Sequence, residues 1–241
     1  MKLSIIYDAI YPYVIGGGEK RLYEISKRLS ENHEIHLFGM KYWEGENIIK
    51  RDNIYLHGIC RPIKLYNKKG RRSIFQPFYF SFFLAGNLFK YNFDLVDCQN
   101  FPFIPCFISK LYSIFKRKPL VITWLEIWGE DVWGKLGIIG KIGKYVERLS
   151  FRLTNKNILF MSTKSNKLNG ETRIIPLGID LEKIKKIKPS KEKFDVLFVG
   201  RLIKEKNVDL LIKSIKESDL KLGIIGNGPE KENLKKLAKS L

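Results

Sequence analysis

The chain has 241 residues, of which 44% are hydrophobic and 29% charged, which fits a soluble globular protein of one or two domains. Lys and Arg number 44 against 25 Asp and Glu, and the net charge of +19 favours polyanionic partners such as nucleic acid, anionic lipid or phosphorylated substrates. A lysine-rich composition that places lysine on every solvent-facing surface explains the same charge, so both interpretations stay open. The segment 1–10 is too short for a signal peptide.

In chain order, the pattern of apolar residues predicts alternating strands and helices. A buried strand at 2–7 is followed by a loop at 8–18 with three consecutive glycines, and then by a helix that reaches Arg28. Further strands are predicted at 34–38, 53–57, 95–98, 120–124, 158–161 and 173–175, and helices at 103–115 and 137–153. The helix at 137–153 is amphipathic, with apolar residues at 139, 142, 146, 149 and 153.

The segment 75–93 is unusually aromatic, and no charged residue occurs from Ser73 to Phe89. That uncharged length is near the lower limit of roughly 17–25 residues for a membrane-spanning helix. Polar residues, a proline and a glycine interrupt it, at Gln76, Pro77, Ser81, Gly86 and Asn87. We therefore predict a helix that packs on the sheet, not a membrane span.

After a lysine-rich connection at 181–192, the pattern of strand and helix starts again. Strands are predicted at 194–199 and 222–225, and helices at 207–216 and 230–241. Alternating strands and helices predict an α/β fold in which a doubly wound parallel sheet has helices on both faces. The restart predicts a second sheet, and we place an N-terminal Rossmann-like domain at 1–185 and a partial second one at 186–241.

The cysteines and histidines form no pattern typical of a metal or redox site. The cysteines are Cys60, Cys98 and Cys106, and the histidines are His33, His36 and His57. We interpret the cysteines as reduced structural thiols of a cytosolic protein. Because no histidine adjoins a cluster of Cys, Asp or Glu in the sequence, we expect no zinc site built by the protein.

Three glycine-containing loops lie where a predicted strand ends and a helix begins, at 16–19, 200–201 and 226–229. Glycine lets a backbone approach a ligand closely, and the N–H groups at a helix N-terminus attract anions. In parallel sheets, ligands bind at the carboxyl ends of the strands. None of these loops is a P-loop or a GxGxxG fingerprint, so each by itself is equally consistent with a tight turn.

Taken together, the loops and their surroundings resemble a known family. The stretches VGRLIKEKNVDLLIKSI (199–215) and LGIIGNGPEKENLKKLAKSL (222–241) resemble the donor domain of family-4 GT-B glycosyltransferases. The N-terminal GGGE loop with its helix resembles their first domain, and STKSNKL (162–168) and IIPLGIDLEKI (174–184) their passage between domains. The resemblance covers the whole chain.

The resemblance implies a site for the diphosphate of a nucleotide-sugar donor. Arg201 and Lys206 would bind the diphosphate, Gly16 and Gly17 would face it from the first domain, and Gly226 and Gly228 would line the nucleotide side. An Arg forms paired hydrogen bonds to phosphate and a Lys supplies a compact charge, which suits a departing diphosphate. The alternative is that both cations are solvated surface charges. Relatives mostly retain the anomeric configuration without a metal, so no cofactor is expected.

The sequence departs from the family pattern at two places. In TWLEIWG (123–129), Leu125 occupies the position where relatives commonly carry His, and a Leu neither donates a hydrogen bond nor transfers a proton. Glu126 or Glu130 would partly compensate, Glu126 being our catalytic candidate, although either is equally a loop carboxylate. The family's Glu-x7-Glu motif has no counterpart before Leu241, so we expect a truncated donor domain: a gene remnant, half of a split gene, or a chain completed by a partner.

A basic cluster precedes the aromatic segment, and no acidic residue lies among its members. The cluster comprises Arg61, Lys64, Lys68, Lys69, Arg71 and Arg72. Cations beside exposed aromatic residues are typical of a site that docks on an anionic membrane surface. The alternative is that the aromatic residues belong to the core and the cluster is a solvated loop.

The function that these observations predict is transfer of a hexose from a nucleoside-diphosphate sugar, with retention, to a lipid-linked or polysaccharide acceptor. We expect a cytoplasmic enzyme of cell-envelope glycan synthesis, peripheral at the inner face of the membrane. An inactive remnant or one subunit of a split transferase is the alternative. A nucleic-acid-binding protein is a remote one, since no recognition-helix, RNP or zinc-finger pattern supports it.

Overall fold

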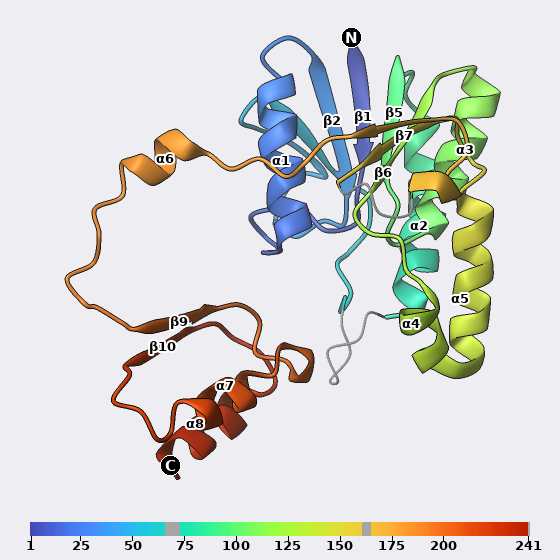
Figure 1. Cartoon of the computed structure of the whole chain (residues 1–241). Coiled ribbons are helices and arrows are strands. Elements are labelled where there is room, and N and C mark those ends of the chain that lie inside the picture. The colour runs from blue at the N-terminus through green and yellow to red at the C-terminus, as the bar shows by residue number, and fades with distance from the viewer. Residues whose placement is uncertain (66–72, 161–164, 241) are drawn as a thin grey trace. The chain divides into compact units, whose positions relative to one another are not determined.

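A computed structural model of the chain describes residues 1–65, 73–160 and 165–240, except for the side chains of Glu130 and Asp131. The chain forms two compact units (Figure 1). Unit 1 comprises 1–63 and 74–178, and unit 2 comprises 64–73 and 179–241. The two units adjoin in sequence at Gly178, inside the segment 174–184 that resembles the family's passage between domains.

Unit 1 is built on an eight-stranded sheet with the order β3-β4-β2-β1-β5-β6-β7-β8. The strands are β1 Lys2–Ile6, β2 Glu34–Gly39, β3 Ile48–Arg51, β4 Ile54–Gly58, β5 Leu95–Gln99, β6 Leu120–Trp124, β7 Lys156–Leu159 and β8 Glu171–Ile174. All neighbours pair in parallel except β3 and β4, which are antiparallel. The structure thus confirms the predicted parallel α/β sheet.

Strand β3 was not predicted, and its sequence explains why. It is a short edge strand, and of its four residues three are exposed and one is partly buried. Its sequence, IIKR, has two apolar residues, whereas the interior strands β1 and β6 read KLSII and LVITW because helices bury both faces of a parallel sheet. A strand that buries so little leaves a weaker signal in the sequence.

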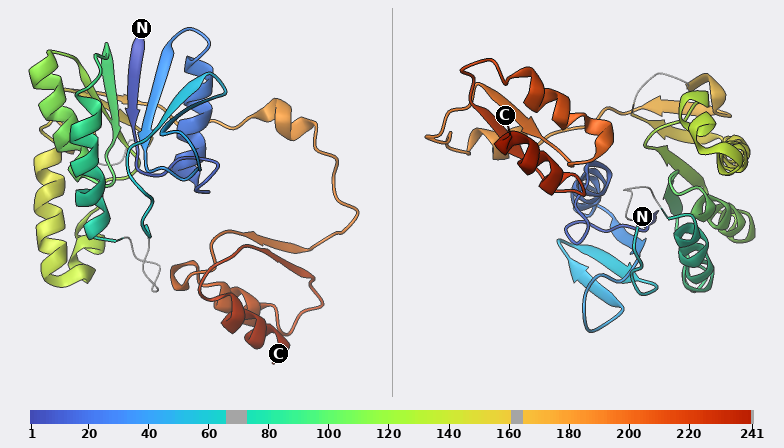
Figure 2. Two further views of the ribbon diagram at one scale, coloured as in Figure 1. Left: turned by 180° about the vertical axis from the view of Figure 1, so that it is seen from behind. Right: turned by 90° about the horizontal axis from the view of Figure 1, so that it is seen from below.

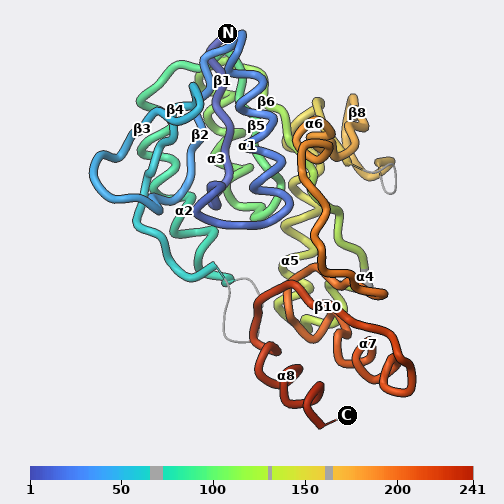
Figure 3. The backbone as a smooth tube through the Cα atoms, turned by 90° about the vertical axis from the view of Figure 1, so that its left-hand side faces the viewer, coloured from blue at the N-terminus to red at the C-terminus, as the bar shows by residue number. Residues whose placement is uncertain are grey.

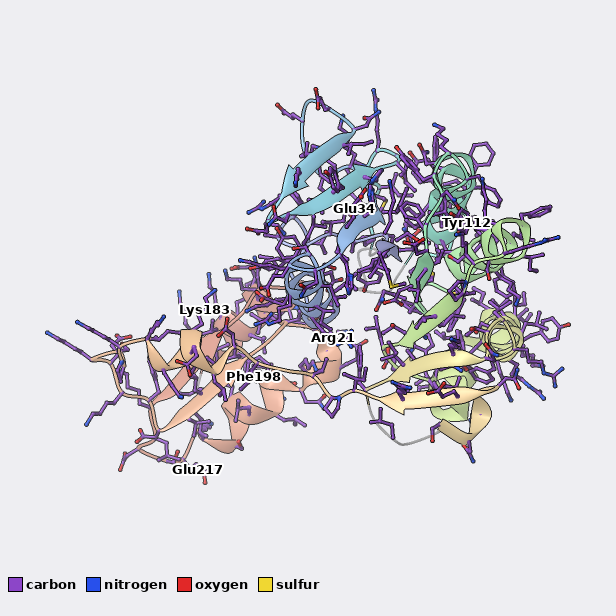
Figure 4. The ribbon with its side chains drawn as sticks, turned by 90° about the horizontal axis from the view of Figure 1, so that it is seen from above. Arg21, Glu34, Tyr112, Lys183, Phe198 and Glu217 are labelled. Carbon is purple, nitrogen blue, oxygen red and sulfur yellow. The ribbon has the colours of Figure 1, made fainter. Side chains whose placement is uncertain are left out.

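Helices cover both faces of this sheet. They are α1 Gly17–Leu29, α2 Phe75–Leu88, α3 Ile104–Lys116, α4 Glu130–Trp133 and α5 Gly137–Ser150, with the 3-10 turns η1 Gly134–Leu136 and η2 Ser165–Lys167. Helix α1 lies on one face, and α2, α3 and α5 lie side by side on the other (Figures 2 and 4). The aromatic segment forms α2, as predicted, and buries Phe80, Leu84 and Leu88. No helix of the described part is long and apolar enough to cross a membrane.

Helix α5 is amphipathic, as predicted, but its buried side is formed by small and polar residues. Ile139, Ile142 and Leu149 are exposed, and the buried residues are Gly140, Glu147 and Ser150. Gly140 faces inward because it packs against Trp133: a Cβ atom at Gly140 would lie 1.9 Å from the carbonyl oxygen of Trp133. Glycine permits this close approach, so the small side of the helix faces inward.

Unit 2 contains two parallel strands, β9 Val196–Val199 and β10 Leu222–Ile225. Its helices are α6 Leu181–Lys185, α7 Val208–Ser214 and α8 Lys231–Lys239, with the 3-10 turn η3 Lys204–Lys206 (Figure 3). Residues Leu202, Val208, Ile212 and Leu234 form its core, against which Phe198, Leu222 and Leu237 pack. The side chains on the opposite face of the strands, Leu197, Val199 and Ile225, are 54%, 67% and 59% exposed.

A buried pair of histidines joins β2 to β4. Nδ1 of His36 lies 2.7 Å from Nε2 of His57, and Nε2 of His36 lies 2.7 Å from Oε1 of Glu34. The imidazole of His57 also stacks on Phe38, with ring centroids 4.3 Å apart. Burial, together with the charges of His36 and Lys2, lowers the pKa of His57 from 6.5 to about 3. Neither the pair nor this shift was visible in the sequence.

We predict that acid destabilises unit 1 through His57. Because its folded pKa lies below 6.5, the unfolded chain binds the proton first as the pH falls, and stability is lost below about pH 6.5. The contribution is roughly 2 kcal/mol between pH 7 and pH 5. Urea unfolding at both pH values should show a smaller loss for His57→Phe, which keeps the aromatic stacking. Equal losses for the two proteins would contradict this assignment.

Candidate functional site

The glycine loop at the carboxyl end of β1 leads directly into α1, which begins at Gly17. No side chain caps the first N–H groups of this helix. A Cβ atom at Gly17 would meet nothing within 4 Å, so the backbone at this position is open to an approaching group. The positive end of a 13-residue helix with uncapped donors is suited to an anion.

Gly16 has a different local role. A Cβ atom there would lie 2.2 Å from Oε2 of Glu19, so glycine makes room for this carboxylate. Glu19 is only 7% exposed, and its Oε1 accepts a hydrogen bond from the hydroxyl of Tyr7 at 3.3 Å. Packing of Glu19 is therefore sufficient to explain Gly16, whereas Gly17 has no such internal neighbour.

The loop after β6 meets the glycine loop at Leu125. The Cβ position of Gly18 lies 3.5 Å from Cδ1 of Leu125. Asn100, the residue that follows β5, forms two hydrogen bonds with the backbone of the loop after β6. Its Oδ1 accepts from the backbone N–H of Leu125 at 2.8 Å, and its Nδ2 donates to the carbonyl of Glu126 at 3.1 Å.

Asn100 was missed in the sequence, although a polar residue directly after a buried central strand was the available signal. The structure thus gathers the glycine loop, Leu125 and Asn100 at the carboxyl ends of β1, β5 and β6. The Glu126 side chain is exposed, and only its backbone takes part in the contact with Asn100. The side chain of Glu130 lies outside the described residues.

Helix α1 is anchored to the sheet by Arg21 (Figure 4). Its guanidinium carbon lies 3.8 Å from the ring centroid of Phe160, which follows β7. Asp97 on β5 accepts a hydrogen bond from the hydroxyl of Thr123 at 2.8 Å. Burial raises the pKa of Asp97 to about 6, an effect that the Thr123 bond and the Arg21 charge oppose. Charge attraction and ring contact thus hold the helix that carries the glycine loop.

In unit 2, the loops that follow β9 and β10 are bonded to each other. The backbone N–H of Gly200 donates to the carbonyl oxygen of Ile225 at 3.0 Å. The N–H of Leu202 donates to the carbonyl of Asn227 at 2.9 Å, and the N–H of Glu230 donates to the carbonyl of Leu202 at 3.1 Å. A Cβ atom at Gly226 would lie 2.0 Å from the carbonyl oxygen of Gly200. One at Gly228 would lie 2.2 Å from that of Leu202.

Glycine at 226 and 228 is therefore required by contact between the loops, whether or not a ligand binds. Arg201 and Lys206, the two predicted diphosphate-binding residues, are exposed in the segment between β9 and α7. Gly16 and Gly17 belong to unit 1, and Arg201, Lys206, Gly226 and Gly228 belong to unit 2. Each group is assembled within its own unit.

The remaining predicted features are described only in part. Arg61 and Lys64 are exposed, whereas Lys68, Lys69, Arg71 and Arg72 lie outside the described residues. All three cysteines are free and buried. Two of them, Cys98 and Cys106, have sulfur atoms 3.6 Å apart, a proximity that their spacing in the sequence did not suggest. Among the described residues, no three His, Cys, Asp or Glu side chains gather into a metal-binding group.

Comparisons with known proteins agree on one family. Residues 180–241 match the family model for glycosyl transferases group 1. An uncharacterized glycosyltransferase of Methanocaldococcus jannaschii is 30% identical, with the match covering 97% of this chain and 66% of that protein. The chain thus spans slightly less than two thirds of the length of this relative.

Solved structures share the fold at low sequence identity. The sucrose-phosphate synthase of Thermosynechococcus elongatus superposes with a TM-score of 0.73 at 11% identity, covering 99% of this chain and 67% of that one. The Anabaena protein HepE, in complex with UDP and glucose, superposes with a TM-score of 0.62 at 18% identity, covering 99% and 65%. At these identities the likeness shows a common architecture.

The contact between loops in unit 2 predicts that Gly228→Ala is destabilising. The new methyl group would press on the carbonyl oxygen of Leu202 and separate the loops, at a cost of about 2 kcal/mol. Amide hydrogen exchange should show reduced protection in β10 and α8. Gly178→Ala is the matched control, since its Cβ atom would meet nothing within 4 Å. Unchanged protection in Gly228→Ala would rule out this role.

Proposed function

Because residues 180–241 match the family model for glycosyl transferases group 1 and the chain has the GT-B fold, we propose that it moves a hexose from a nucleoside-diphosphate sugar to an acceptor. Two similar structures support the donor class: HepE binds UDP and UDP-glucose, and SsfS6 from Streptomyces binds thymidine diphosphate. The observation that carries the proposal is the pair of bonded loops in unit 2, in which Arg201 is exposed.

In this proposal, Arg201 and Lys206 bind the donor diphosphate. Breaking the glycosidic bond leaves negative charge on the diphosphate, so cations held near it lower the barrier. Both side chains are exposed in the structure, which leaves them accessible to a ligand. Within unit 1, the open backbone at Gly17 and the uncapped start of α1 are a separate candidate for binding an anion. Transfer proceeds without a metal and with retention of configuration.

The side chain of Leu125 restricts which chemical groups unit 1 can offer to a donor. It lies beside Gly18 and can neither transfer a proton nor bind a polar group of the donor through its side chain. Asn100 fixes the backbone of this loop through two hydrogen bonds, so the position of Leu125 is well defined. Catalysis in this proposal therefore rests on stabilising the leaving group, with the exposed carboxylate of Glu126 as the candidate for contacting the sugar.

The proposed acceptor is a lipid-linked or polysaccharide glycan of the cell envelope, reached from the cytoplasmic side of the membrane. The high positive charge of the chain, +19, favours an acceptor that carries phosphate or another anion. An anionic acceptor and an anionic donor would both be drawn to such a protein by long-range attraction.

Isothermal titration with UDP, GDP and their sugars tests the donor site. We expect binding of one nucleotide, weakened about ten- to a hundredfold in Arg201→Ala, since a charge-assisted hydrogen bond is worth about 1.5–3 kcal/mol. Lys216→Ala removes an equally exposed cation from the same unit and should bind as the unchanged protein does. Equal affinity of Arg201→Ala and the unchanged chain would remove Arg201 from the site.

A second candidate function is that of a subunit completed by another polypeptide. The uncovered side of β9 and β10, with Leu197, Val199 and Ile225 exposed, favours it, because apolar sheet faces and free edges usually pair or pack. Absence of binding to every nucleotide by the chain alone would favour this candidate over the first.

The subunit candidate has its own prediction. Adding a polypeptide that supplies further strand–helix units should slow amide exchange in β9 and β10 and generate nucleotide binding that Arg201→Ala removes. Leu197→Ser together with Ile225→Ser should weaken this association, while Ile187→Ser, an exposed apolar residue outside the sheet, should not. If exchange in both strands stays unchanged on mixing, the candidate is wrong.

A further inference from the structure

The face of unit 1 formed by α2, α3 and α5 is apolar toward solvent. In α2, Phe80 packs inward, Tyr79 and Phe83 are partly buried, and Phe75, Phe78 and Phe82 are exposed at helical spacing. The other exposed apolar residues are Leu111, Ile114 and Phe115 on α3, and Ile138, Ile139, Ile142, Tyr145 and Leu149 on α5. We call these eleven side chains, with Phe82 and Ile138 each 77% exposed, the apolar face.

The apolar face is carried by three helices on the same side of the sheet. The views in Figures 2 and 4 agree in placing α3 between α2 and α5 on the same side of the sheet. Isolated exposed apolar residues are ordinary, but eleven of them on three helices of one sheet face favour a surface that meets another apolar phase.

The described charged side chains that α2, α3 and α5 expose have one sign. The cations are Lys110, Lys116, Arg117 and Lys118 on α3 and its end, and Lys141, Lys144, Arg148 and Arg152 on α5 and its end. Helices α2 and α3 contain no acidic residue. The single acidic residue of α5, Glu147, is 3% exposed and accepts hydrogen bonds from Trp128 and Trp133. The solvent-facing charges of these three helices are therefore all positive.

Cations and apolar side chains meet at a hollow beside α5. The hollow has a volume of about 1040 Å³, and its walls include Tyr145 and Leu149 of the apolar face together with Lys144, Arg148 and Arg152. Trp128, Trp133 and Glu147 also line it, and the Glu147 carboxylate is occupied by its hydrogen bonds to the two tryptophans. The lysine and arginine side chains of the hollow suit an anionic headgroup.

We propose that the apolar face docks unit 1 on a bilayer containing anionic phospholipid. The exposed side chains of α2, α3 and α5 enter the boundary between headgroups and acyl chains, and the flanking lysines and arginines contact lipid phosphates. The cations that do this belong to α3 and α5, whereas the sequence had pointed to the cluster at 61–72. The inference does not depend on the proposed function, because docking requires no glycosyl transfer.

Vesicle flotation tests the proposal. The full chain is mixed with vesicles of phosphatidylcholine alone or of phosphatidylcholine with an equal amount of phosphatidylglycerol. We expect at least about tenfold stronger binding to the anionic vesicles, declining as salt is raised. Phe82→Ser with Ile142→Ser should weaken binding about tenfold by removing inserted apolar area. Lys141→Glu with Arg148→Glu should abolish the preference for anionic vesicles.

The matched control is Ile187→Ser with Lys188→Glu, which makes the same two kinds of change at exposed residues between α6 and β9. It should bind vesicles as the unchanged chain does. Circular dichroism and thermal melting check that each variant is folded. We expect folded variants because all the substituted residues are exposed. Absence of binding to anionic vesicles, or equal binding by all variants, would overturn the proposal.

A second copy of the chain is the competing occupant of the apolar face. Light scattering at increasing protein concentration distinguishes it. A dimer that Phe82→Ser with Ile142→Ser dissociates, in a chain that does not float with vesicles, would assign the face to self-association and overturn membrane docking. A monomer that binds anionic vesicles supports it.

Discussion

The parallel pairing of β1 with β2 on one side and β5 on the other is the constraint on which unit 1 depends. Pairing satisfies the buried backbone N–H and C=O groups, and it requires the chain to leave β1 in one direction and return on the other side after β4. The carboxyl ends of β1, β5 and β6 therefore lie next to one another. As a result the glycine loop, Asn100 and Leu125 meet although the sequence separates them widely.

Several glycines of the candidate site satisfy packing first. Gly16 makes room for a buried carboxylate, and Gly226 and Gly228 allow two loops to approach each other through their backbones. Packing and ligand binding are not exclusive, because a loop held by backbone contacts presents its remaining groups in a fixed geometry. Gly17 is the exception, since open space surrounds the position of its missing side chain. A motif that resembles a ligand-binding loop thus contains residues with different physical reasons for being glycine.

The sequence allowed most of the fold to be predicted because strands and helices have distinct hydrophobic periods. The strand at 120–124 and the one at 222–225 were predicted to the residue. The edge strand β3 was missed because only two of its four residues are apolar, and the burial of Gly140 in α5 was not predicted because it depends on the contact with Trp133. Local periodicity contains no information about such neighbours.

The sequence alone determined the alternation of strands and helices, the places of the glycine loops and the likeness to group 1 glycosyltransferases, since these follow from local patterns. The tertiary structure alone decided which residues meet: Leu125 with the glycine loop, His36 with His57, and the exposed side chains of α2, α3 and α5 in one face. These contacts depend on strand order and helix packing, which bring together residues far apart in the chain. A local sequence pattern does not contain that information.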